Sequence, residues 1–100
     1  MIKHIVMWKL KDTAEGKTKK ENAEIIKKRL ESLKGKVEEL KGLEMGININ
    51  SSDAAYDLSL YSEFECQEDL DKYQVNPLHL EIVKYVKKVV QDRKVVDYIV

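Results

Sequence analysis

The amino-acid sequence predicts an α+β fold of the ferredoxin-like type, a βαββαβ sandwich with both helices on one face of a four-stranded antiparallel sheet. Two patterns support this prediction. Four segments have the period of two expected of strands, and two others repeat apolar residues at the spacings of an amphipathic helix. The chain has 100 residues, so we expect one domain that spans residues 1–100.

The first predicted strand spans residues 2–10 and has apolar side chains on both faces, which indicates that both faces of the sheet are covered. We expect the face that contains His4 to lie toward the helices. That face carries Ile2, His4, Val6, Trp8 and Leu10, and the other carries Lys3, Ile5, Met7 and Lys9.

A polar connection over residues 11–17 leads to the first helix, which the sequence starts with a capping box. Thr18 and Glu21 have the spacing at which a hydroxyl and a carboxylate satisfy free amides of the first helical turn. Apolar residues then recur every three or four positions as far as Leu40, and Gly42 ends the segment. The apolar stripe that should pack on the sheet consists of Ala23, Ile26, Leu30, Leu33, Val37 and Leu40.

Residues 43–50 and 56–64 alternate again and are predicted to form adjacent antiparallel strands joined by a short hairpin. A short helical turn over residues 66–73 follows. Asn76 then suits the N-cap of the second long helix, and Pro77 suits its first position, where the missing amide costs nothing.

The second long helix is expected to run to Lys88, before a last strand over residues 94–100 with apolar residues on both faces. The buried face of this helix is predicted to consist of Leu78, Ile82, Tyr85, Val86 and Val89.

Because both helices cover the same face, the other face of the sheet needs a cover, and the simplest cover is the same face of a second copy. The sequence therefore predicts a homodimer through the sheet face. Three carboxylates, Asp57, Glu63 and Asp97, are assigned to that face, either paired with strand lysines or forming a cation site. Its apolar residues are expected to be Ile5, Met7, Tyr61, Val95 and Ile99.

Composition excludes several functions. Lysine plus arginine and aspartate plus glutamate number 18 each and are interspersed, which argues against nucleic-acid partners and anionic membranes. The single cysteine, Cys66, and the lack of a membrane-length apolar run fit a cytoplasmic protein. No phosphate-binding glycine loop, serine-hydrolase motif or cysteine–histidine cluster is present, so we expect no cofactor and no metal.

Three side chains are candidate catalytic residues: His4, Tyr73 and His79. On the predicted fold they could meet at one end of a cavity between sheet and helices, where imidazoles and a phenol are suited to moving protons. The alternative is a core histidine bonded to a carbonyl and an exposed histidine early in a helix. The walls of such a cavity, as ligand-binding residues, would be Val6, Trp8, Leu58 and Leu60.

Three segments resemble the stress-responsive A/B barrel domain family, also called the Dabb or dimeric α/β barrel domain. They are IKHIVMWKLK, AYDLSLYSEFECQEDLDKYQVNPLH and VVDYIV. The resemblance implies a sheet-to-sheet homodimer. It also implies that His4, Tyr73 and His79 match the residues with which a plant polyketide cyclase of this family closes a ring. Asn76 replaces a histidine of the family's Y-x-x-H-P-x-H segment, and residues 17–40 lack a further tyrosine of the cyclase.

Three functions remain open from the sequence. The first is a dimeric protein that binds a small, largely apolar or aromatic ligand between sheet and helices. The second is a cofactor-independent enzyme of the cyclase or lyase type, in which His79 takes a proton from a carbon next to a carbonyl. The third is a structural domain that docks another protein. A related barrel family uses the same fold for oxygenases that act on aromatics or haem, which is an argument from fold alone.

Overall fold

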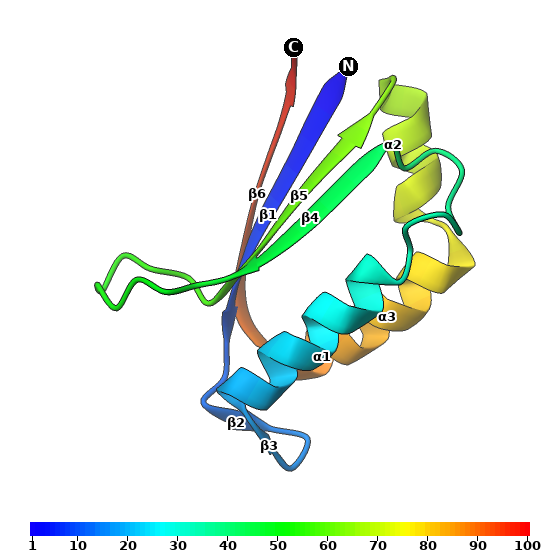
Figure 1. Ribbon diagram of the computed structural model, residues 1–100. Coiled ribbons are helices and arrows are strands. Elements are labelled where there is room, and N and C mark those ends of the chain that lie inside the picture. The colour runs from blue at the N-terminus through cyan, green and yellow to red at the C-terminus, as the bar shows by residue number, and fades with distance from the viewer.

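A four-stranded antiparallel sheet with helices on one face makes up the computed structural model, which describes residues 1–100 (Figure 1). The strand order in the sheet is β4-β5-β1-β6. This is the ferredoxin-like arrangement that the sequence predicts, with α2 as an additional short helix. The elements are β1 (Ile2–Leu10), β2 (Thr13–Ala14), β3 (Lys17–Thr18), α1 (Lys19–Glu31), β4 (Gly42–Ile47), β5 (Leu58–Phe64), α2 (Gln67–Gln74), α3 (Pro77–Val89) and β6 (Val90–Ile99).

Strand β1 lies in the centre of the sheet and supplies one row of the core. Its helix-facing residues alternate with residues of the other face, as predicted, and all five are buried. Apolar residues of α1, α3, β4 and β5 complete one continuous core between sheet and helices. None of the helices has the length and apolar character needed to span a membrane.

Strand β6 has the opposite phase to the one that the sequence suggested. In antiparallel strands, directly opposite residues share a face. Val95, Asp97 and Ile99 lie opposite Val6, His4 and Ile2, and therefore face the helices. The assignment of these three β6 residues to the other face is wrong. The physical reason is that β6 is apolar on both sides, so hydrophobic alternation does not determine which set faces inward.

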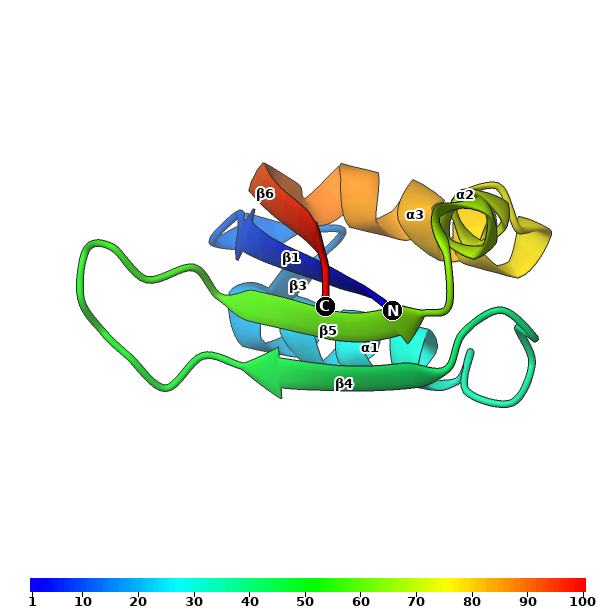
Figure 2. The ribbon, with the colours of Figure 1, turned by 90° about the horizontal axis from the view of Figure 1, so that it is seen from above.

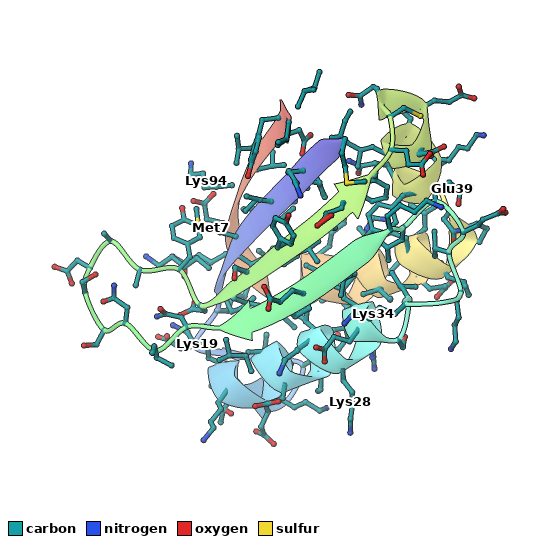
Figure 3. All side chains as sticks on the ribbon, turned by 45° about the horizontal axis from the view of Figure 1, so that its top comes forward. Met7, Lys19, Lys28, Lys34, Glu39 and Lys94 are labelled. Carbon is teal, nitrogen blue, oxygen red and sulfur yellow. The ribbon has the colours of Figure 1, made fainter.

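The uncovered face of the sheet, called here the open face, carries exposed apolar side chains. Figure 3 looks obliquely onto it and shows Met7 of β1 beside Lys94 of β6, its partner in the strand register. Lys3 and Glu63 form an ion pair of 3.2 Å on this face. The apolar residues of the open face are Ile5, Met7, Tyr61, Val96 and Tyr98.

Helix α1 begins as predicted and ends earlier. The Thr18 hydroxyl accepts from the Glu21 amide at 3.2 Å, and the Glu21 carboxylate accepts from the Thr18 amide at 3.0 Å. The helix ends at Glu31, and residues 32–40 form turns. Within these turns Gly35 has a φ of 78°, a left-handed conformation that glycine adopts at low cost and that a continuing α-helix does not contain.

The connection after β1 contains a small hairpin, β2–β3, where the sequence suggested only a polar segment. Its turn residues, Glu15 and Gly16, both have positive φ, as a type I′ hairpin turn requires. Buried Asn22 holds the hairpin, because its amide donates to the Ala14 carbonyl at 3.1 Å and its oxygen accepts from the Tyr85 hydroxyl at 2.5 Å.

Strands β4 and β5 are joined by a long loop, residues 48–57, instead of a short hairpin. Figure 2 shows this loop extending beyond the sheet. The predicted start of α3 is correct, since the Asn76 side chain accepts from the Leu78 amide at 2.9 Å. Leu78 itself is exposed, contrary to the prediction, because it lies in the first turn of α3, away from the core.

Candidate functional site

A cavity of about 330 Å³ lies between β1, β6 and α3. This volume is within the range of small-ligand sites, which are mostly apolar with a few polar groups. Its apolar lining comprises Val6, Trp8, Leu30, Leu60, Leu80, Ile82, Val83, Val86 and Val90. Its polar lining comprises His4, Gln74, His79, Lys87 and Arg93.

His4 lies on the central strand, with its side chain only 2% exposed. Its Nδ1 is hydrogen-bonded to the Asp97 carboxylate from the neighbouring strand β6. A carboxylate accepts, so Nδ1 carries the donated proton, and in the neutral tautomer this leaves the lone pair on Nε2. Nε2 makes no hydrogen bond within the chain. Because the only polar side-chain atom that is both buried and unpaired is the Tyr73 hydroxyl, Nε2 is accessible from the cavity that the ring lines.

His79 lies in the first turn of α3, where the Asn76 cap and Pro77 fix the start of the helix. Its Nδ1 donates to the Gln74 carbonyl in a long hydrogen bond of 3.4 Å, which leaves Nε2 as an acceptor. Burial is the main cause that lowers the pKa of His79, the hydrogen bond to Gln74 opposes this shift, and the positive charge of Arg93 lowers the pKa further. At neutral pH the side chain is therefore an uncharged base.

Tyr73 of α2 packs beneath the two histidines. Its ring centroid lies 4.3 Å from that of His79 and 6.4 Å from that of His4. The hydroxyl is the only buried side-chain polar atom without a hydrogen-bond partner. Burial raises the pKa of Tyr73 above its usual range, so the phenol stays protonated and keeps an unused donor.

The structure brings most of the sequence-predicted site residues together. His4, His79, Val6, Trp8 and Leu60 all line the cavity. The other two predicted residues do not line it: Tyr73 touches the histidine rings from beneath, and Leu58 is buried in the core.

Four polar residues around the cavity were missed by the sequence reasoning. Asp97 and Arg93 were missed because the phase of β6 was wrong, and its register with β1 is the signal that recovers them. Gln74 and Lys87 come from the end of α2 and from α3, and no sequence pattern distinguishes them from other surface residues.

The arrangement supplies two imidazoles and a phenol next to an apolar cavity. Two imidazoles with free acceptor nitrogens can bind a hydroxyl or take a proton, and a phenol can donate to an oxyanion. No group of three or more histidine, cysteine or acidic side chains is placed to hold a metal ion.

The model of the family described as "Stress responsive A/B Barrel Domain" matches residues 2–100. Comparison with curated proteins gave no match. A dimeric protein of unknown function and ferredoxin-like fold from Bacteroides fragilis is 31% identical, with a TM-score of 0.86 over 97% of this chain and 93% of that chain.

Two less similar structures share the fold. A dimeric ferredoxin-like protein of unknown function from Thermobifida fusca is 21% identical, with a TM-score of 0.85 over 99% of this chain and 90% of that chain. The hydroxynitrile lyase from Passiflora edulis is 19% identical, with a TM-score of 0.80 over 99% of this chain and 92% of that chain.

Proposed function

Because the chain belongs to the stress responsive A/B barrel domain family, we propose that it is a homodimer whose cavity binds a small, largely apolar or aromatic molecule. The observation that carries this function is the cavity of about 330 Å³, which remains open between sheet and α3 although the core beside it is packed. Its walls are mainly apolar, and the accessible nitrogens of His4 and His79 offer two acceptors that orient a ligand.

A larger side chain that fills part of the cavity should weaken ligand binding. Val83 of α3 lines the cavity and is partly exposed, so Val83→Phe places a ring there at little cost to the fold. Octanamide and 3-phenylpropanamide serve as apolar test ligands. We expect the affinity for both amides to fall about tenfold, because each amide must displace the new ring. Trp8 is the only tryptophan and lines the cavity, so its fluorescence reports binding.

The matched control is Lys84→Phe, which adds the same ring to the next, exposed position of α3. It should bind both amides as the wild type does. If Val83→Phe binds both amides as tightly as the wild type does, the cavity is not the ligand site.

The homodimer is supported by the open face and by the relatives. Both the Bacteroides and the Thermobifida proteins are described as dimeric. In this chain Met7, Val96 and Tyr98 are each at least 42% exposed on one sheet face, with no element of the chain to cover them. A second copy of the same face would cover this patch on both protomers.

A second candidate function is proton transfer next to a carbonyl, as in the cyclase or lyase alternative. The observation that favours it is the partnerless Tyr73 hydroxyl beside the neutral His79 ring. In this reaction Nε2 of His79 takes the proton from the α-carbon, and the enolate oxygen is stabilised by a donor. Return of a solvent deuteron from the imidazolium to the carbon completes an exchange that can be followed.

Tyr73→Phe should make the protein more stable and a poorer catalyst. Removing a buried hydroxyl that has no partner should raise the free energy of unfolding by about 1 kcal/mol or more. The rate at which the protein exchanges α-protons of 2-octanone in D₂O should fall at least about tenfold. Urea unfolding and proton NMR measure the two effects.

Tyr85→Phe is the control, because its hydroxyl is paired with Asn22 and lies outside the cavity lining. It should lose stability and leave exchange unchanged. If the wild type exchanges 2-octanone no faster than buffer does, proton transfer is discarded and ligand binding stands.

A further inference from the structure

Two cationic side chains line the cavity without a counter-charge. Arg93 projects from the helix-facing side of β6, opposite Trp8, and Lys87 projects from α3. Both are exposed, and neither takes part in any ion pair of the chain. They therefore place uncompensated positive charge at the edge of an apolar cavity.

Their neighbours on the same elements behave differently. On α3, Lys84 pairs with Glu81 at 3.0 Å and Lys88 pairs with Glu15 at 3.6 Å, whereas Lys87, which faces the cavity, has no acidic partner. On β6, Lys94 of the open face pairs with an aspartate at 3.7 Å, whereas Arg93 has none. Among the cations of α3 and β6, the two that lack an acidic partner are the two that line the cavity.

No carboxylate lines the cavity to neutralise these charges. The nearest acidic residue along β6 on the same face, Asp97, is engaged by Nδ1 of His4. The charge of Arg93 also reaches into the site, since it contributes to the lowered pKa of His79. The cavity thus has apolar walls, two imidazoles and a cationic edge.

We propose that the cavity selects small apolar acids, whose carboxylate is held by Arg93 and Lys87 while the hydrocarbon part fills the space between β1 and α3. This inference rests on the proposed ligand-binding function and names the class of ligand. An arginine guanidinium suits a carboxylate because its donors can bind both oxygens. The apolar walls disfavour strongly hydrated anions such as free phosphate.

The test compares acids with amides of the same shape. Octanoate is matched by octanamide, and 3-phenylpropanoate by 3-phenylpropanamide, so that the two members of each pair have nearly the same shape and only the acid carries a negative charge. Trp8 fluorescence gives the dissociation constants. We expect each acid to bind about threefold to tenfold more tightly than its amide, the range for a charge pair that water partly screens. Added salt should weaken the binding of the acids and leave the binding of the amides unchanged.

Arg93→Gln should remove most of the preference for acids over amides, and Lys87→Gln should reduce this preference less. Lys34→Gln removes one exposed positive charge from the turns after α1, at a position that does not line the cavity, and should have no effect. Because all three positions are exposed, the variants should fold, and circular dichroism checks this.

The outcomes separate the two proposals. If acids and amides bind equally, or if Arg93→Gln keeps the full preference for acids, the carboxylate proposal is overturned while ligand binding in the cavity stands. If neither member of a pair binds, the proposed ligand-binding function fails, and the carboxylate proposal with it.

Discussion

Replacing Phe64 by alanine should lower the free energy of unfolding by about 3–5 kcal/mol, the range for removal of a buried aromatic ring. Phe64 ends β5 and is fully buried. Its ring centroid lies 5.1 Å from that of Tyr73 and 6.4 Å from that of His4. The space left by the missing ring would therefore remove a packing contact from both Tyr73 and His4. The expected loss is large, because the total stability of a domain is of the order of 5–15 kcal/mol.

Urea unfolding followed by circular dichroism measures the loss, and NMR of the two imidazoles shows whether the site is disordered. Phe64→Leu is the matched variant, because it keeps most of the volume and should cost less than about 1.5 kcal/mol. A loss below about 1 kcal/mol for Phe64→Ala would mean that the ring does not support the core as its burial indicates.

The elements that sequence reasoning placed well are those in which local chemistry and hydrophobic pattern agree. At the start of α1, the Thr18–Glu21 capping box and the apolar stripe point to the same helix. In β1, the buried row and the open row differ clearly enough to set the phase. The turns after Glu31 were missed because Leu33 and Val37 stay buried without being helical, so the apolar spacing continued past the helix end.

The site was predicted less completely, for a different reason. His4 and His79 are brought to the cavity by β1 and α3, whose phases the sequence determines. The residues that set its charge, Asp97 and Arg93, come from β6. There the phase depends on the register with β1, which shifts at Lys9/Leu10. Single-sequence periodicity does not contain that register, because both faces of β6 are apolar.

Val96→Asp should dissociate the proposed dimer. Val96 lies on the open face opposite Ile5 and is 52% exposed. In a dimer that covers this face, the substitution buries an unpaired carboxylate on each protomer. We expect the dimer dissociation constant to rise by about a thousandfold, which corresponds to roughly 4 kcal/mol. Sedimentation equilibrium measures the change.

Val95→Asp is the control that makes this experiment decisive. Val95 is the adjacent residue on the same strand and is 49% exposed, but it faces the helices. The two variants have the same added charge, the same loss of β propensity and nearly the same exposure, so only the face differs. The phase suggested by the sequence would require Val95→Asp to dissociate the dimer and Val96→Asp to leave it intact. The register of β6 with β1 requires the opposite result, and it is the same register that brings Asp97 to His4 and Arg93 to the cavity.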